Sequence, residues 1–263
     1  MGGVNMMIAA RAIGMGIVLL AVIAALVAPS SATDTAKAPA LGLPPLPEVK
    51  PASPLQVALG KKLFFDRRLS VNNTLSCAMC HIESQAFASV QTATAVGMEG
   101  RSLSRNTPTL LNVVYQRTLF HDGRENELSQ QVWLHLLLAN EMATPSNGPV
   151  LERIRGLEDY PGPFGTAVEG APPSMQTIGD AIAAYERTLI SGNSRFDRWH
   201  FGRDERALDA REKLGFELFV GKAGCVRCHR IEERSALFTD HGFHNTGIGY
   251  AAARGRTRRK WNV

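Results

Sequence analysis

Two copies of one short motif constrain this chain more than any other feature of its sequence. Residues 77–81 read Cys-Ala-Met-Cys-His and residues 225–229 read Cys-Val-Arg-Cys-His, and together they contain all four cysteines of the 263 residues. On one helical turn, two thiols can add to the vinyl groups of one porphyrin while the following histidine reaches its iron. The pattern therefore predicts two covalently attached c-type haems. The predicted attachment residues are Cys77, Cys80, Cys225 and Cys228, and the proximal iron ligands are His81 and His229.

Two other kinds of site use the same residues. Four cysteines in two pairs could bind one tetrahedral zinc ion, and a single pair could form a thioredoxin-like dithiol site. Zinc does not require a histidine after each pair, and the two pairs lie far apart in the sequence. A dithiol site needs a βαβ context, and strand patterns are almost absent from the sequence. Haem attachment is therefore the favoured interpretation.

The N-terminus has the pattern of an export signal. Arg11 precedes an uncharged apolar stretch over residues 12–28, and small residues then lead to an expected cleavage after Ala32. An uncleaved anchor helix is the alternative. Either way the body of the chain is expected in the periplasm, and cleavage would leave no membrane span. Residues 33–54, rich in alanine and proline, are expected to form a flexible lead-in.

Composition excludes several classes of protein. The chain is 44% hydrophobic and 20% charged, near the globular average, which argues against a fibrous or disordered protein. Arg11 and five basic residues in the last ten positions account for the net charge of +5, so the rest of the chain is close to neutral. A basic tail over residues 251–263 can bind nucleic acid, but no nucleic-acid motif accompanies it. No nucleic-acid partner is expected.

The spacing of apolar residues predicts an all-α fold. A Leu-Phe pair precedes each motif, Leu63-Phe64 before the first and Leu218-Phe219 before the second, which indicates an internal repeat. We therefore expect two cytochrome c-like helical domains, residues 55–195 and residues 196–250. Helices are predicted over residues 55–65, 127–140, 176–190 and 204–219, and long loops over residues 84–126 and 141–175.

An ordered set of further segments accompanies the two motifs. In chain order they are LFFDRRLSVNNTLSCAMCH, SRNTPTLLNVVY, FHDGRENELSQQ, NEMA, AIAAYERTLISGNSRFDRW, GFELFVGKAGCVRCH and FHNTGIG, which run from about residue 55 to residue 249. Together they resemble the bacterial dihaem cytochrome c peroxidase/MauG family. The resemblance implies a periplasmic enzyme with a peroxide-reacting haem in the N-terminal domain and an electron-transfer haem in the C-terminal domain.

The resemblance also implies catalytic roles for Glu141 and Gln131. Glu141 would take a proton from bound hydrogen peroxide and return it to the leaving oxygen, and Gln131 would orient the peroxide. Without the resemblance, both residues would be ordinary helix positions at the surface. One straight helix would separate the two by about 15 Å, so both can serve one haem only if the helix breaks between them. The family often has Gly-Pro there, whereas this chain has Leu134-His135.

Three more positions take their interpretation from the resemblance. Met98 stands where some peroxidases place a removable distal histidine, and a packing role is the alternative. Asn106 matches a calcium ligand of the family, so calcium is implied as a further cofactor. His121 stands where the family commonly has a tryptophan between the haems. The remaining histidines are expected in structural or surface positions (His135 and His200) or near the second haem (His241 and His244).

Reduction of hydrogen peroxide is the favoured function, with electrons from a small cytochrome c or a cupredoxin. The alternatives are a MauG-like oxidase that modifies a protein substrate and an electron-transfer cytochrome without turnover. The resemblance also favours a homodimer. Family members continue past the FHNTG segment and supply a distal ligand to the second haem, whereas no methionine follows Met175 here. We therefore expect a truncated product whose partial second domain leaves apolar surface uncovered.

Overall fold

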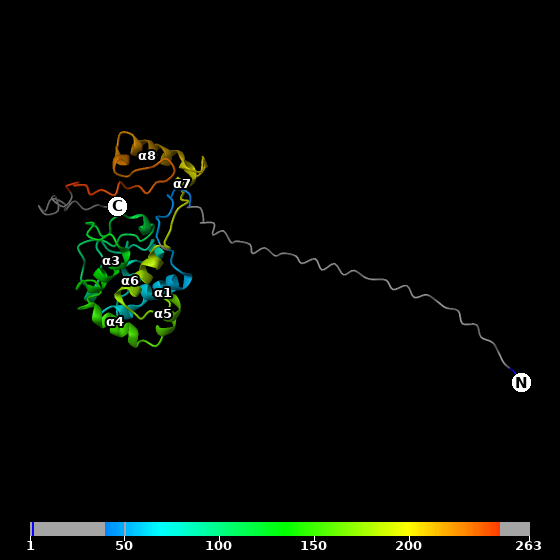
Figure 1. Ribbon diagram of the computed structural model, residues 1–263. Helices are drawn as coiled ribbons and strands as arrows, with labels where there is room; N and C mark the ends of the chain where they lie inside the picture. The colour runs from blue at the N-terminus through cyan, green and yellow to red at the C-terminus, as the bar shows by residue number, and fades with distance from the viewer. Residues whose placement is uncertain (1, 3–39, 50, 248–263) are drawn as a thin grey trace. The chain divides into compact units, whose positions relative to one another are not determined.

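The computed structural model describes residues 2, 40–49 and 51–247 (Figure 1). The predicted export signal, most of the lead-in and the basic tail lie outside these residues. Within the described ranges, every helix is too short or too polar to cross a lipid bilayer.

All the regular secondary structure in the described residues is helical. The α-helices are α1 (Pro54–Phe65), α2 (Cys77–Cys80), α3 (Leu128–Leu137), α4 (Asn147–Gly156), α5 (Pro161–Ala167), α6 (Met175–Glu186), α7 (Arg195–His200) and α8 (Ala210–Val220). Short 3-10 turns are η1 (Arg67–Leu69), η2 (Glu83–Gln85), η3 (Met98–Gly100), η4 (Val113–Tyr115) and η5 (Cys225–Arg227). Pairing of extended backbone among these residues is confined to isolated bridges. The predicted all-α fold class is confirmed.

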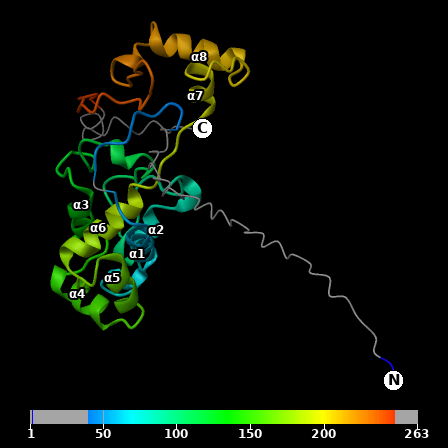
Figure 2. The same ribbon diagram turned by 45° about the vertical axis from the view of Figure 1, so that its right-hand side comes forward.

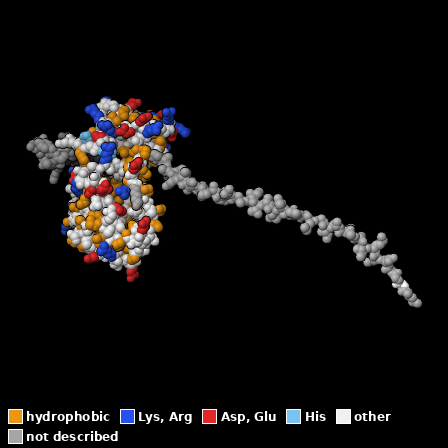
Figure 3. Space-filling model, in the orientation of Figure 1, with side chains coloured by type: hydrophobic (Ala, Val, Ile, Leu, Met, Phe, Trp, Pro, Cys, Tyr) orange, Lys and Arg blue, Asp and Glu red, His pale blue; other side chains and the backbone are white. Residues whose placement is uncertain are grey.

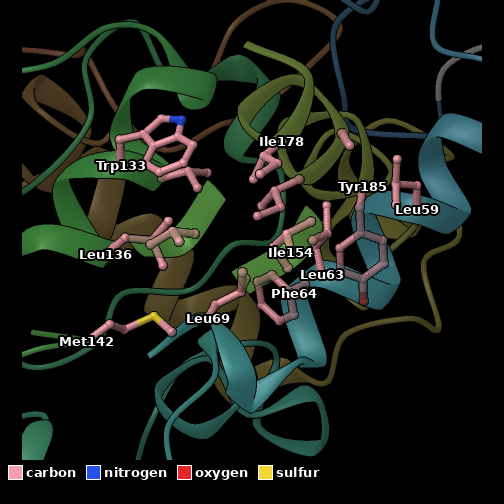
Figure 4. Packing of buried hydrophobic residues seen from close by; sticks show 14 of the residues in the cluster. Leu59, Leu63, Phe64, Leu69, Trp133, Leu136, Met142, Ile154, Ile178 and Tyr185 are labelled. Carbon is pink, nitrogen blue, oxygen red and sulfur yellow. The ribbon is translucent and has the colours of Figure 1, made fainter. Parts of the chain in front are cut away.

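One hydrophobic core joins α1, α3, α4, α5 and α6 (Figure 4). α1 and α6 lie side by side in both ribbon views (Figures 1 and 2), and α3 packs against α6. Gly60 allows this close approach of α1 to α6, because a Cβ there would clash with the carbonyl oxygen of Ala181. Leu63 and Phe64 at the end of α1 are completely buried. The core therefore holds the segment that leads into the first motif.

Several helix boundaries differ from the predicted ones. α3 ends at Leu137 and not at residue 140, because the chain reverses after Leu138. The segment predicted as a loop over residues 141–175 contains two helices, α4 and α5. On α4, the apolar residues Val150 and Ile154 are one turn apart and wholly buried. The helix predicted from residue 204 begins later, because Asp209 caps it by accepting the N–H of Glu212.

The region around the second motif is much less buried than the first. α8 contains no buried residue, and Leu214 and Leu218 on it are exposed. In the space-filling view, hydrophobic side chains reach the surface among the charged ones (Figure 3). The predicted truncation of the second domain stays a prediction. The domain boundary expected at residue 195 stays a prediction.

Candidate haem-binding and peroxide site

The first motif forms a single helical turn, α2. The backbone N–H of His81 donates to the carbonyl oxygen of Cys77 at 2.8 Å and closes the turn. Cys77 and Cys80 are free thiols and half-buried. The turn therefore presents two thiols and an imidazole together, as covalent attachment of one haem requires.

The imidazole of His81 is held by its Nδ1 atom. Nδ1 lies 2.9 Å from the carbonyl oxygen of Phe87, which can only accept, so Nδ1 carries the proton and the lone pair of the neutral ring is on Nε2. Burial lowers the pKa of His81 to about 4 and keeps the ring neutral. Phe87 has a left-handed backbone with φ 55°, and the ring of Phe64 lies 6.4 Å from that of His81. This is the arrangement that a histidine ligand of haem iron needs.

The second motif repeats this geometry. The N–H of His229 donates to Cys225 at 2.9 Å, and its Nδ1 lies 2.9 Å from the carbonyl oxygen of Phe238. Phe238 also has a left-handed backbone, with φ 53°. The ring of Phe219 lies 6.2 Å from that of His229, as Phe64 lies beside His81. The predicted internal repeat therefore extends from the sequence to the hydrogen bonds, and the residues at both motifs fit a c-type haem.

The second motif also lies beside a group of potential metal ligands. Single ligand atoms of Cys228, Asp240 and His244 all lie within 4.8 Å of one another, close enough to share a metal ion. His244 Nε2 is 2.8 Å from the Asp240 carboxylate. Over the described ranges this is the one group of three such residues, and it includes no cysteine of the first motif. Among the described residues, the four cysteines of the two motifs are therefore not gathered into one such group.

Gln131 and Glu141 are brought onto one side by the end of α3. Gln131 and His135 are four residues apart on α3 and share a face of the helix. After Leu138 the chain turns back, and the N–H of Glu141 donates to the carbonyl oxygen of Leu138 at 2.9 Å. The Glu141 carboxylate then lies 2.5 Å from His135 Nδ1. The required break is present, but it follows Leu134-His135 and does not occur at that pair.

Glu141 lies close to the first motif. Burial and the charge of Glu141 both raise the pKa of Cys80, and the charges of His135 and Glu141 act on the pKa of His81. The backbone beside Glu141 is held as well, because the N–H of Met98 donates to the carbonyl oxygens of Asn140 and Glu141 at 3.3 and 3.1 Å. The proposed catalytic carboxylate and the predicted proximal histidine therefore belong to one neighbourhood.

The ligand roles of Met98 and Asn106 stay predictions. Met98 is buried, which suits either a packing role or an axial ligand. The side chain of Asn106 accepts the N–H of Thr107 at 2.8 Å and donates to the carbonyl oxygen of Ser89 at 2.9 Å. His121 Nε2 lies 3.1 Å from the backbone oxygen of Asn106. In this structure these groups therefore hold the long loop together.

The structure gives two residues near the first motif surroundings that the sequence did not predict. His135 was assigned a structural or surface role, although its spacing of four from Gln131 on a helix could have placed both on one face. Glu186 at the end of α6 is buried, and burial raises its pKa to about 8. Its charge also contributes, after burial, to the raised pKa of Cys77. A buried carboxyl of this kind has no signal in a single sequence.

Residues 54–205 match the protein family described as di-haem cytochrome c peroxidase (CCP_MauG). This match includes the first motif and ends before the second. The methylamine utilization protein MauG of Methylorubrum extorquens is 40% identical over 205 residues, which cover 78% of this chain and 56% of MauG. The cytochrome-c peroxidase IdrP1 of Denitromonas iodatirespirans is 37% identical over 237 residues, covering 87% of this chain and 60% of IdrP1. The chain thus spans a little over half the length of these relatives.

Solved structures show the same likeness. A MauG-like protein associated with microbial copper homeostasis superposes with a TM-score of 0.66 at 31% identity, covering 78% of this chain and 64% of that protein. The diheme peroxidase BthA of Burkholderia thailandensis gives a TM-score of 0.65 at 30% identity, covering 76% of this chain and 56% of BthA. The helical arrangement described above is therefore shared with a MauG-like protein and with a diheme peroxidase.

Proposed function

Because this chain belongs to the di-haem cytochrome c peroxidase (CCP_MauG) family, we propose that it reduces hydrogen peroxide to water in the periplasm. The observation that carries the proposal is the position of Glu141, whose carboxylate is held by His135 close to the CxxCH turn that ends in His81. A carboxylate near bound peroxide can move a proton between its two oxygens. A cytochrome that only transfers electrons has no need of such a group.

Haem would be held at two places by residues of this chain. Cys77 and Cys80 would attach the first haem with His81 as its proximal ligand. When bound, haem supplies an iron that binds peroxide and passes electrons. The corresponding residues for the second haem are Cys225, Cys228 and His229.

Glu141 and Gln131 would perform the proton chemistry and the orientation. Reduction of one hydrogen peroxide to two waters takes up two electrons and two protons. Glu141 accepts the proton of one peroxide oxygen and delivers it to the other, so that the leaving oxygen departs as water. Gln131, on the same helix face as His135, hydrogen-bonds the peroxide and fixes its direction. The electrons come from a small redox protein, a cytochrome c or a cupredoxin.

A second candidate function is MauG-like oxidation of a protein substrate, which the 40% identity to MauG favours. In that case the two electrons come from side chains of the partner protein, which is oxidised while peroxide is reduced. The two candidates differ in the reductant. Steady-state peroxide consumption with a reduced small cytochrome c supports the first candidate, and consumption only with a protein that becomes covalently modified supports the second.

Replacement of Glu141 tests the proposed mechanism. Glu141→Gln keeps the size of the side chain but removes the base, so peroxide reduction by the holoprotein is expected to fall about 10²- to 10⁴-fold. The matched control is Glu152→Gln, since Glu152 is an exposed carboxylate on α4. An unchanged rate in Glu141→Gln, with both haems still bound, would show that the role assigned to Glu141 is wrong.

Haem attachment is tested by intact mass and by the optical spectrum of the purified protein. Wild type is expected to carry two haems, and the double variants Cys77→Ala/Cys80→Ala and Cys225→Ala/Cys228→Ala one each. A protein with one haem and one bound metal ion would instead assign Cys228 to the cluster with Asp240 and His244.

A further inference from the structure

Glu141 has a hydrogen-bond partner that the peroxidase role leaves unassigned. We propose that His135 is a positioning residue that holds the Glu141 carboxylate toward the first haem site by donating its Nδ1–H to it. The proposal rests on the proposed function, because Glu141 is its proton-transferring group. His135 itself need not touch peroxide or haem.

The contact between the two side chains is direct. His135 Nδ1 lies 2.5 Å from one carboxylate oxygen, Oε2 of Glu141. An ionised carboxylate can only accept, so the imidazole is the donor and its Nδ1 carries the proton. The side chains of His135 and Glu141 are 35% and 19% exposed, so water competes only partly for this bond. Hydrogen bonds to charged groups are among the stronger ones in proteins.

Glu141 needs such a partner because its backbone lies outside a helix. It follows α3 in a turn, where its N–H donates to Leu138 and its carbonyl oxygen accepts the N–H of Met98. Among the described residues, His135 supplies the one side-chain hydrogen bond to its carboxylate. The bond occupies Oε2, so the second oxygen, Oε1, is left to face a substrate.

His135 is itself firmly placed. It is one turn beyond Gln131 on α3, so the two polar side chains share a face. Its ring lies 4.9 Å from the ring of Phe120, and the guanidinium of Arg124 covers that phenyl ring at 3.5 Å. The loop that carries Phe120 is closed by the N–H of Leu119, which donates to Glu125 at 2.7 Å. The imidazole therefore has two fixed neighbours, the tilted ring of Phe120 and the carboxylate at Nδ1.

Two substitutions at His135 distinguish the effect of its hydrogen-bond donor from the effect of its packing against Phe120. His135→Asn keeps an N–H at nearly the position of Nδ1, whereas His135→Leu removes the donor and keeps apolar bulk against Phe120. The holoprotein of each is tested for peroxide reduction and for the rate at which hydrogen cyanide binds the ferric haem. Hydrogen cyanide must also lose a proton to a distal base, and its binding requires no electron donor. His200→Asn, outside this site, is the control.

The donor role predicts that His135→Leu lowers both rates by about ten- to a hundredfold. His135→Asn is expected to stay within about threefold of wild type. In a Glu141→Gln background, His135→Leu should produce no further loss, because the group it positions is gone. The haem spectrum and thermal midpoint of each variant establish that it is folded.

The proposal is overturned if His135→Leu behaves as wild type, if the asparagine and leucine variants are equally impaired, or if their losses add to that of Glu141→Gln. Failure of the proposed function has a different signature. Wild type would then not reduce peroxide with any small electron donor, while cyanide binding would still show whether His135 and Glu141 act together.

Discussion

The two CxxCH turns have the same internal geometry and very different surroundings. In each, the histidine donates its backbone N–H to the first cysteine and its Nδ1–H to a phenylalanine carbonyl oxygen at 2.9 Å. Phe64, beside the first histidine, is completely buried, whereas Phe219, beside the second, is half-buried. His81 is half-buried and His229 is exposed.

The difference shows that the motif determines the local hydrogen bonds, whereas distant segments of the chain determine how deeply the motif is buried. The turn and its two hydrogen bonds arise from residues close in sequence, so both copies form them. Burial of the first copy depends on α6 and α3, which are distant in sequence and enclose the end of α1. α8 precedes the second copy as α1 precedes the first, but it contains no buried residue. It contacts η5 of its own motif and, through Glu212 and Phe216, the short helix α7. A haem-attachment turn can therefore be formed outside the buried core.

Truncation of the equivalent phenylalanines tests this comparison most strongly. Phe64→Ala is expected to lower the free energy of unfolding by about 3–5 kcal/mol, because it opens a cavity in a packed core. Phe219→Ala is expected to lower it by about 1 kcal/mol, because that ring is only partly removed from water. Urea unfolding of the two holoproteins measures both values. Similar losses for the two variants would mean that bound haem buries both sites equally.

The sequence predicted much of this contrast. The Leu-Phe pairs revealed the repeat, since short-range patterns survive in any surroundings. α4 and α5 were missed because glycine and proline in Asn147–Gly156 and Pro161–Ala167 mask a short apolar spacing. Tertiary burial of Val150 and Ile154 overrides those weak helix propensities.

The site was predictable only in part. The cysteines and histidines of the motifs are readable from spacing, because covalent attachment demands it. The link between His135 and Glu141 depends on a reversal of the chain after Leu138, which includes Ala143 in a left-handed conformation with φ 57°. No residue type at that turn predicts the reversal, so the hydrogen-bond partner of Glu141 could be identified only from the structure.

A buried carboxyl provides a second contrast between the two regions. Burial raises the pKa of Glu186 to about 8, well above its value of about 4.5 in an unfolded chain. The folded state therefore holds a proton that the unfolded state has lost, and stability falls as the pH rises from about 4.5 to 8. Between pH 6 and pH 8 the loss is expected to reach about 2 kcal/mol.

Glu186→Gln should remove this dependence on pH, because the amide does not titrate. Urea unfolding at several pH values from 5 to 8 measures it. The matched variant is Glu217→Gln, since Glu217 is exposed on α8, and its unfolding curve should follow wild type at every pH. A wild-type stability that stays constant over this range would show that Glu186 is solvated in the holoprotein.

The smallest expected contrast concerns two ion pairs, one that directly follows α1 and one that joins α7 to α8. Burial alone would raise the pKa of Asp66, but hydrogen bonds from Arg68 and Tyr160 outweigh it and lower the pKa. Its carboxylate is only 8% exposed, and the Arg68 contact is 2.6 Å. Glu212 pairs with Arg195 at the same distance, but these side chains are 35% and 57% exposed.

Asp66→Asn is therefore expected to lower the free energy of unfolding by about 1–2 kcal/mol at pH 7, and Glu212→Gln by about 0.5 kcal/mol. The stabilisation from Asp66 is present above its unfolded pKa, near 4, and is lost as the pH falls through its lower folded value. The difference between wild type and Asp66→Asn should consequently shrink in acid, and added salt should weaken the Glu212 pair more than the Asp66 pair. Equal salt sensitivity of the two pairs would contradict the comparison, because it would place both in the same solvent environment.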